Sequence, residues 1–198
     1  PEGMQSSSLA PILGAARSGL VDPARDHAVT GRERHVAEAR DGFLPYPHRA
    51  LRTRDFLYVR NFAPDRWPMG APYAADTTGA LTAQQLESDT FCAFPDMDAS
   101  PTKAWLVLHR DTSEWQWHYQ RAFGKRPAEE LYDLRTDRDQ TRNLAGDPAF
   151  AEQKARLAAD LMDRLKTAGD PRVTAVPVPF EHPPYTGARE MKTQKKQR

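Results

Sequence analysis

The sequence has one cysteine, Cys92, and almost no net charge. A single cysteine excludes an internal disulfide and cannot by itself form a zinc site. The 28 Lys and Arg side chains nearly balance the 27 Asp and Glu side chains, for a formal net charge of +1. No global field would therefore draw in nucleic acid or an anionic membrane, and we expect neither as a partner. The basic tail 187–198 has no interleaved aromatic residues, and we expect it to be mobile.

Long hydrophobic runs are also missing. The longest candidate, residues 105–108, is bounded by Lys103 and Arg110, far short of the roughly 20 apolar residues that span a bilayer. The chain opens on Pro1-Glu2-Gly3, with neither an initiator Met nor an apolar leader. We expect the natural polypeptide to begin further upstream.

The common motifs of phosphate and metal sites are absent as well. The sequence has no Gly-x-Gly-x-x-Gly, Walker or Gly-x-Ser-x-Gly segment, and its six histidines include no His-x-x-x-His pair. Asp96 and Asp98 form an Asp-x-Asp pair without the Gly and Glu of a calcium loop, which predicts a solvated turn. We assign no metal site, and we predict that Cys92 acts as a small apolar side chain.

The sequence does contain enough apolar residues for a core, at 39% hydrophobic, and seventeen prolines that predict many loops. Residues 27–34 predict a strand, residues 49–62 a hairpin and residues 130–134 a short strand. A short helix is predicted after Ser100-Pro101, and a long one after Asp147-Pro148 that ends before Gly169 and Pro171. The buried stripe predicted for the long helix consists of Phe150, Leu157, Leu161 and Leu165.

Several segments, in this order, resemble the C-terminal region of sulfatases, especially the branch similar to N-sulfoglucosamine sulfohydrolase (sulfamidase). They are residues 7–13 (SSLAPIL), 31–35 (GRERH), 46–62 (YPHRALRTRDFLYVRNF), 123–134 (FGKRPAEELYDL) and 137–145 (DRDQTRNLA). Each segment alone is only moderately specific, but their combination and order are specific to this family.

The resemblance implies an α/β fold of the alkaline-phosphatase-like superfamily. Residues 1–47 would be the end of its catalytic α/β domain, with residues 27–34 as the last strand of the main sheet. Residues 48–186 would form the C-terminal subdomain, a small antiparallel sheet packed with the C-terminal helix, and 187–198 the tail. The resemblance also implies a periplasmic or secreted protein.

Sulfatases attack sulfur with a formylglycine made in a Cys-x-Pro/Ala-Ser-x-Arg segment, beside calcium or another divalent cation. Residues 92–95 (CAFP) lack the Ser and Arg of that segment. We therefore expect no catalytic residue and no metal ligand here, and no turnover by this chain alone. Both would belong to an N-terminal catalytic part, which would be its partner in hydrolysing a sulfated sugar or a small sulfate ester.

What remains is substrate contact. Ligands of open α/β sheets sit beyond the carboxyl ends of the strands, so His35 would emerge on the pocket side if residues 27–34 end the main sheet. Sulfamidase-like members carry a histidine at the matching place, close to the sugar site, and Arg32 would add positive charge for an anionic glycan. The alternatives are a partly buried His35 bonded to a neighbouring loop, and Arg32 and Arg34 paired with Glu33 and Glu38.

Two other functions remain open. Trp115, Trp117 and Tyr119 alternate with polar residues, so they could stack on a sugar ring in a stand-alone carbohydrate-binding or interaction module, or cover a subdomain core. A phosphohydrolase of the same superfamily is the other alternative. We expect packing from Tyr46 and Arg49, which flank Pro47.

Overall fold

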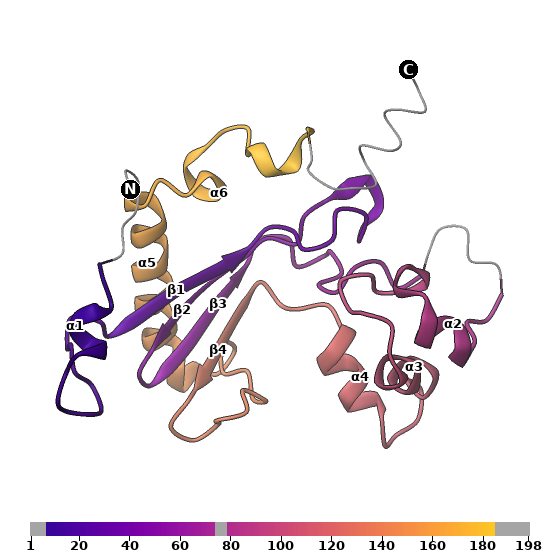
Figure 1. Ribbon diagram of the computed structural model, residues 1–198, viewed down its shortest axis with the longest axis horizontal. Helices are drawn as coiled ribbons and strands as arrows, with labels where there is room; N and C mark the ends of the chain where they lie inside the picture. The colour runs from indigo at the N-terminus through magenta and orange to yellow at the C-terminus, as the bar shows by residue number, and fades with distance from the viewer. Residues whose placement is uncertain (1–6, 74–78, 185–198) are drawn as a thin grey trace. The chain divides into compact units, whose positions relative to one another are not determined.

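The computed structural model describes residues 7–73 and 79–184. Its centre is a four-stranded antiparallel sheet in the order β1-β2-β3-β4, combined with helices in a mixed α/β architecture (Figure 1). The strands are β1 (His27–Arg32), β2 (His48–Thr53), β3 (Phe56–Asn61) and β4 (Glu129–Asp133). The small antiparallel sheet with a C-terminal helix is confirmed, and the tail 187–198 lies outside the described residues.

The predicted hairpin is formed by β2 and β3. Thr53 closes its turn, because its Oγ1 accepts from the Phe56 amide at 3.1 Å and donates to the Phe56 carbonyl at 3.2 Å. Along β3 the side chains alternate between the two faces of the sheet, with Phe56 and Tyr58 buried and Leu57 and Val59 half-buried. Both faces are therefore covered at least in part, as the apolar pattern predicts.

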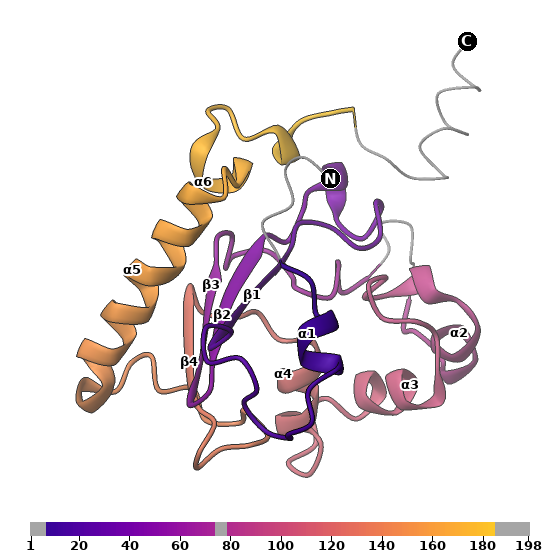
Figure 2. The same cartoon turned by 60° about the vertical axis from the view of Figure 1, so that its left-hand side comes forward.

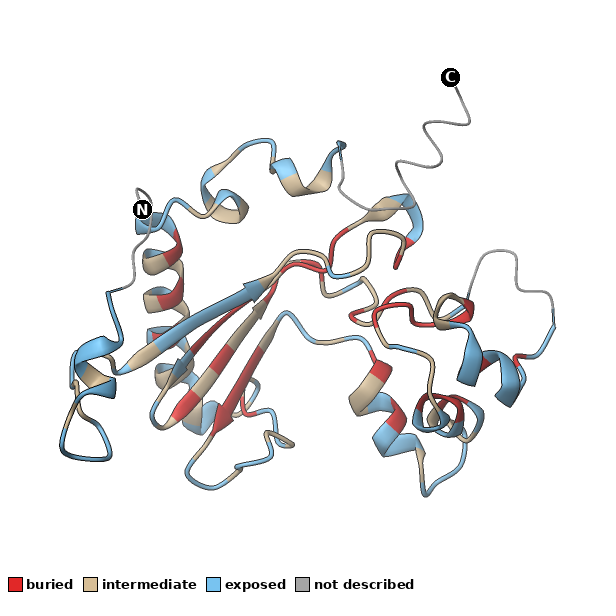
Figure 3. Ribbon diagram, in the orientation of Figure 1, coloured by how far each residue is buried: buried red, intermediate tan, exposed pale blue. Residues whose placement is uncertain are grey.

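Strand β1 lies at the edge of this sheet. Residues 27–32 do form a strand, but it pairs with β2 at the edge of the antiparallel sheet. Most of its residues are exposed (Figure 3). Its role as the last strand of a larger main sheet stays a prediction, so the position of His35 is taken from its own contacts. The boundary after residue 47 concerns a longer polypeptide and stays a prediction.

The long helix α5 (Ala151–Thr167) packs along one face of the sheet (Figures 1 and 2). Leu157, Leu161 and Leu165 are buried on its inner stripe, and each contributes about 1.5–3 kcal/mol relative to an exposed side chain. Asp147 caps the 3-10 turn that leads into the helix, accepting from the Ala149 amide at 3.0 Å. The helix ends before Gly169, whose φ of 68° is readily adopted only by glycine. The predicted helix is confirmed.

The chain divides into two compact units, each built from several segments. The first unit comprises residues 1–30, 50–59 and 130–175, and the second comprises 31–49, 60–129 and 176–198. The first holds α5 and most of the sheet, while one end of each strand belongs to the second. Elsewhere in the first unit are α1 (Ala10–Leu13), η3 (Pro148–Phe150) and α6 (Pro171–Thr174).

The second unit contains three short helices around an apolar cluster. They are α2 (Ala83–Ser88), α3 (Pro101–Leu108) and α4 (Gln116–Phe123), accompanied by the 3-10 turns η1 (Asp41–Phe43), η2 (Thr90–Cys92) and η4 (Pro179–Glu181). Helix α3 begins as predicted, because the Ser100 hydroxyl accepts from the Lys103 amide at 3.2 Å. The buried members of the cluster include Leu86, Phe94, Val107 and Phe123. None of the described helices is long and apolar enough to cross a membrane.

Candidate functional site

His35 follows the end of β1, in the second unit. Its side chain is 58% exposed, and its Nδ1 lies 3.6 Å from Oδ1 of Asp96. The next residue, Val36, donates its amide to the same carboxylate oxygen at 2.9 Å. His35 is thus in contact with a neighbouring loop, as the alternative interpretation expects, yet most of its ring is open to solvent. Both interpretations of this histidine fit that geometry.

Asp96 is buried, with a side chain only 1% exposed. The prediction of a solvated turn at Asp96 is wrong, because the loop folds inward. The Phe94 amide donates to Ala71 at 2.7 Å, the Asp96 amide donates to Met69 at 3.1 Å, and Phe94 takes a left-handed φ of 45°. A Cβ at Gly70 would meet Pro95 at 2.7 Å, so glycine is required for the two loops to pack. Asp98, two residues on, is exposed.

Arg40 holds the far side of the Asp96 carboxylate. Its Nη2 donates to Asp96 Oδ2 at 2.6 Å and to the Pro68 carbonyl at 2.9 Å, and its Nε donates to the Trp67 carbonyl at 2.7 Å. Burial lowers the pKa of Arg40, while the charge of Asp96 opposes that shift. A guanidinium stays charged at any ordinary pH, so the pair is a buried ion pair. It ties together residues 35–40, 67–71 and 94–96.

Arg32 lies at a different place. It lines a shallow hollow of about 410 Å³ at the end of β1, and its Nη2 lies 3.4 Å from the Pro68 carbonyl. The hollow is lined by Gly31, Arg32, Glu33, Arg34, Pro45, Pro179, Phe180, His182 and Pro184. His35 is not among these residues. The structure therefore places the two predicted site residues on one short segment without bringing them into one pocket.

Glu33 pairs with a residue of β2. Its Oε1 accepts from Arg49 Nη2 at 2.7 Å, and both side chains are largely buried. Arg49 reaches Glu33 by crossing Gly31, where an added Cβ would meet Arg49 Cδ at 2.4 Å. The alternative that placed Glu33 among the partners of Arg32 and Arg34 missed this pair, and Arg34 donates to the carbonyl of Phe43. The predicted packing role of Arg49 is confirmed, as is that of Tyr46, which is 3% exposed.

The aromatic trio is divided by α4. Tyr119 packs in the apolar cluster of the second unit, whereas Trp117 is 51% exposed and Trp115 half-buried. The face of Trp117 is partly occupied by Arg121, whose Cζ lies 5.1 Å from the ring centroid. The trio does not form one flat sugar-stacking surface, because Tyr119 is in the core and Trp117, two residues earlier on the helix, lies on a different face.

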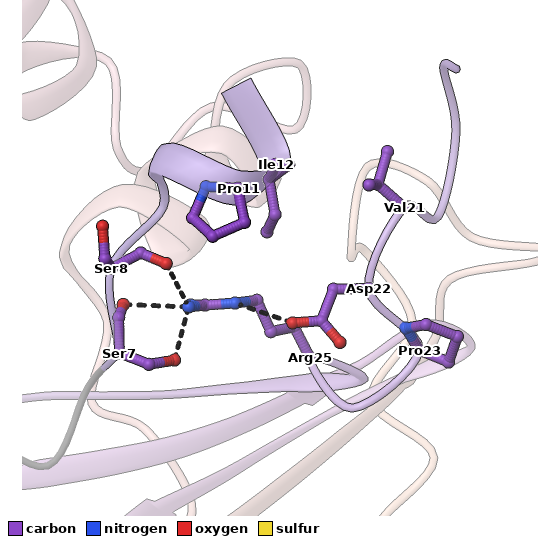
Figure 4. Close-up of a pocket in the computed structure, with 8 residues that line it drawn as sticks. All are labelled: Ser7, Ser8, Pro11, Ile12, Val21, Asp22, Pro23 and Arg25. Atoms are coloured by element: carbon purple, nitrogen blue, oxygen red, sulfur yellow. Dashed lines mark hydrogen bonds and ion pairs between the residues drawn. The ribbon is translucent and has the colours of Figure 1, made fainter. Parts of the chain in front are cut away.

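The first unit has a hollow of its own, of about 510 Å³, at the segment 7–13 (Figure 4). The Arg25 guanidinium fills one side of it and donates through Nη2 to the carbonyls of Ser7 and Ser8 at 2.8 and 2.9 Å. Its Nε donates to Asp22 at 3.2 Å. Since these contacts use the charge of Arg25 internally, the hollow offers a ligand little beyond the apolar faces of Pro11 and Ile12.

Two buried reactive side chains lie in the second unit. Cys92 is 6% exposed, and burial raises the pKa of its thiol. Lys103 is fully buried, and its Nζ donates to the carbonyls of Thr90, Phe94 and Met97 at 2.8–3.4 Å. Burial lowers the pKa of this amine. The burial of Cys92 agrees with the prediction of a small apolar side chain. Lys103 stabilises the loop 90–97 through its three hydrogen bonds to backbone carbonyls.

Within residues 7–73 and 79–184, no group of three His, Cys, Asp or Glu side chains could hold a metal ion. This part of the chain therefore offers no set of side chains that fits the cation centre of the sulfatase resemblance.

No family model matches the chain, and no curated protein matches it. The chemistry of the site therefore follows from the chain's own residues. Those residues offer an exposed imidazole held by a buried ion pair, and a separate basic hollow beside it in the sequence. A guanidinium can donate hydrogen bonds to an anion, and an imidazole can donate to or accept from a hydroxyl group.

Proposed function

We propose that this chain is the C-terminal part of a sulfatase that hydrolyses sulfate esters or sulfamates, with a sugar as the substrate. The observation that carries the proposal is the ordered set of sulfatase-like segments, found on a chain whose small antiparallel sheet and C-terminal helix match the subdomain that the resemblance implies. The strongest of these segments, residues 46–62 and 123–134, coincide with the hairpin and with the approach to β4.

In this proposal His35 and Arg32 contact the substrate. Arg32 lines a hollow that Glu33, Arg34 and the imidazole of His182 also line. A guanidinium pairs well with a sulfate or carboxylate oxygen, and an imidazole can donate to or accept from a sugar hydroxyl. The nucleophile and the cation would be supplied by residues outside this chain, so no step of the hydrolysis is assigned to side chains within it.

The test begins with the complete reading frame that contains this chain. We expect it to encode a Cys-x-Pro/Ala-Ser-x-Arg segment upstream of residue 1. The full protein should release sulfate from 4-nitrophenyl sulfate or from N-sulfoglucosamine, and the variant with that cysteine replaced by Ala should not. The 198-residue chain alone should be inactive.

Two results would contradict the proposal. One is a reading frame without that segment whose product releases no sulfate. The other is faster hydrolysis of 4-nitrophenyl phosphate than of the sulfate, which would favour the phosphohydrolase. Binding of a sulfated glycan by the isolated chain, together with an inactive full protein, would favour the carbohydrate-binding module.

A further inference from the structure

We infer that Asp96 is a positioning residue for His35, and that Arg40 in turn fixes Asp96. The inference rests on the proposed contact between His35 and the substrate, and it adds the residues that orient that contact. Asp96 would keep Nδ1 of the imidazole directed at its carboxylate and leave Nε2 as the nitrogen that meets the ligand.

Two neighbouring groups, the His35 ring and the Val36 amide, contact Asp96 Oδ1. This oxygen accepts from the Val36 amide at 2.9 Å and lies 3.6 Å from Nδ1 of His35. It therefore restrains both the ring of residue 35 and the backbone directly after it. The distance of 3.6 Å is longer than a direct hydrogen bond, but contacts of functional side chains are often long without a ligand and shorten when one binds.

The Asp96 carboxylate is buried. The Asp96 side chain is 1% exposed, whereas that of His35 is 58% exposed. The buried carboxylate therefore presents Oδ1 to the nearer ring nitrogen as a hydrogen-bond acceptor. Because the partner of one ring nitrogen decides which nitrogen carries the proton, Asp96 favours the neutral form protonated at Nδ1.

Asp96 is itself held in place by Arg40. Oδ2 accepts from Arg40 Nη2 at 2.6 Å, and Arg40 is held in turn by the carbonyls of Trp67 and Pro68. The ring of Tyr46 lies below the guanidinium, 5.7 Å from its Cζ. The carboxylate cannot turn away from His35 without breaking a buried ion pair, so an acceptor for Nδ1 is in place before any ligand arrives.

The direct test is the tautomer of His35 in the unmodified full protein, labelled with ¹⁵N at the histidine rings. The resonance of His35 is identified by its loss in the His35→Ala variant. At a pH where the ring is neutral, we expect the proton to reside on Nδ1. A proton residing on Nε2, or shared equally between the two nitrogens, would overturn the inference. This measurement needs no activity and no change at Asp96.

The second test is a double-mutant cycle on sulfate release by the full protein. Asp96→Asn should raise KM by about tenfold, the loss expected for one charge-assisted hydrogen bond, with a smaller change in kcat. His35→Ala should have a similar effect, and the double variant should be no worse than His35→Ala alone. The exposed Asp98→Asn is the matched control and should leave both constants unchanged. Additive losses in the double variant would overturn the inference.

The two tests separate the possible failures. If the full protein releases no sulfate from any substrate, the proposed function fails, and the tautomer still decides the role of Asp96. If Asp96→Asn does not fold, as judged by circular dichroism, the tautomer in the unmodified protein again decides.

Discussion

The two compact units are stabilised in different ways. In the first, a periodic row of leucines on α5 is buried over the sheet, and the interior is largely apolar. In the second, an apolar cluster is accompanied by buried charges, chiefly Arg40, Asp96 and Lys103, that bind loop carbonyls or one another. The second unit has little regular structure of its own to satisfy its backbone, so charged side chains supply the missing hydrogen bonds. Replacement of these buried charged side chains should therefore destabilise the second unit strongly.

The largest effect should come from the buried ion pair. Arg40→Met leaves the Asp96 carboxylate buried without its cation, and we expect a loss of about 3–5 kcal/mol in the free energy of unfolding. Arg54→Met removes an exposed guanidinium from the hairpin and should change it by less than about 0.5 kcal/mol. Urea denaturation followed by circular dichroism measures both. Equal effects of the two variants would show that the buried pair contributes nothing special.

A leucine of α5 should come next. Leu161 is fully buried, and Leu161→Ala removes its packing and leaves a cavity, at a cost of about 3 kcal/mol. Lys166→Ala, on the exposed side of the same helix, should cost less than about 0.5 kcal/mol. The same denaturation experiment compares them. A loss at Leu161 larger than that of Arg40→Met would reverse the ranking of the two units.

Substitution of Lys103 tests how much its hydrogen bonds to the loop 90–97 stabilise the second unit. Lys103→Met keeps the length of the side chain but leaves three carbonyls without their donor, so we expect a loss of about 1–3 kcal/mol. Lys166→Met removes an exposed amine and should remain within about 0.5 kcal/mol. Thermal unfolding of the two variants under the same conditions compares their stabilities. No difference between the variants would mean that Lys103 is held by its apolar stem alone.

The smallest effect belongs to the first unit and depends on pH. Hydrogen bonds from Arg135, at 2.6 and 2.8 Å, hold the pKa of Asp133 below the ordinary value of an aspartate. Because the folded pKa is depressed, this stabilisation is present at neutral pH and is lost as the pH falls through the folded pKa, below about 4. Unfolding of the wild type and of Asp133→Asn should therefore differ at pH 7 and converge below about pH 4. A difference that persists at low pH would contradict this account.

The elements that the sequence predicted are those whose causes are local. The hairpin follows from alternation along β3, and α5 follows from its leucine stripe between Asp147 and Gly169. Helix α2 went unpredicted although its capping box was visible in the sequence, with Thr82 and Gln85 at the required spacing. The pairing of β1 with β2 was missed because strand pairing depends on the path of the whole chain, which a six-residue pattern does not contain.

The candidate site was predicted only in part. His35 came from its place after the expected strand together with the family resemblance, and Arg32 came from its positive charge. Both stay predictions. Asp96 and Arg40 could not be found in a single sequence, because they are 56 positions apart and meet only through the folding of two loops. Nothing in the local sequence distinguishes Asp96 from Asp98, yet only Asp96 is buried. Burial of a charge depends on its tertiary partner, which local composition does not reveal.

The buried thiol of Cys92 gives the chain a built-in reporter. As the sole cysteine of the 198 residues, it can be titrated without interference from any other thiol in this sequence. A raised pKa and a closed environment slow its alkylation while the surrounding cluster is intact. The rate at which iodoacetamide modifies Cys92 would therefore report local opening of the α2–α4 region, which denaturation curves of the whole chain do not resolve.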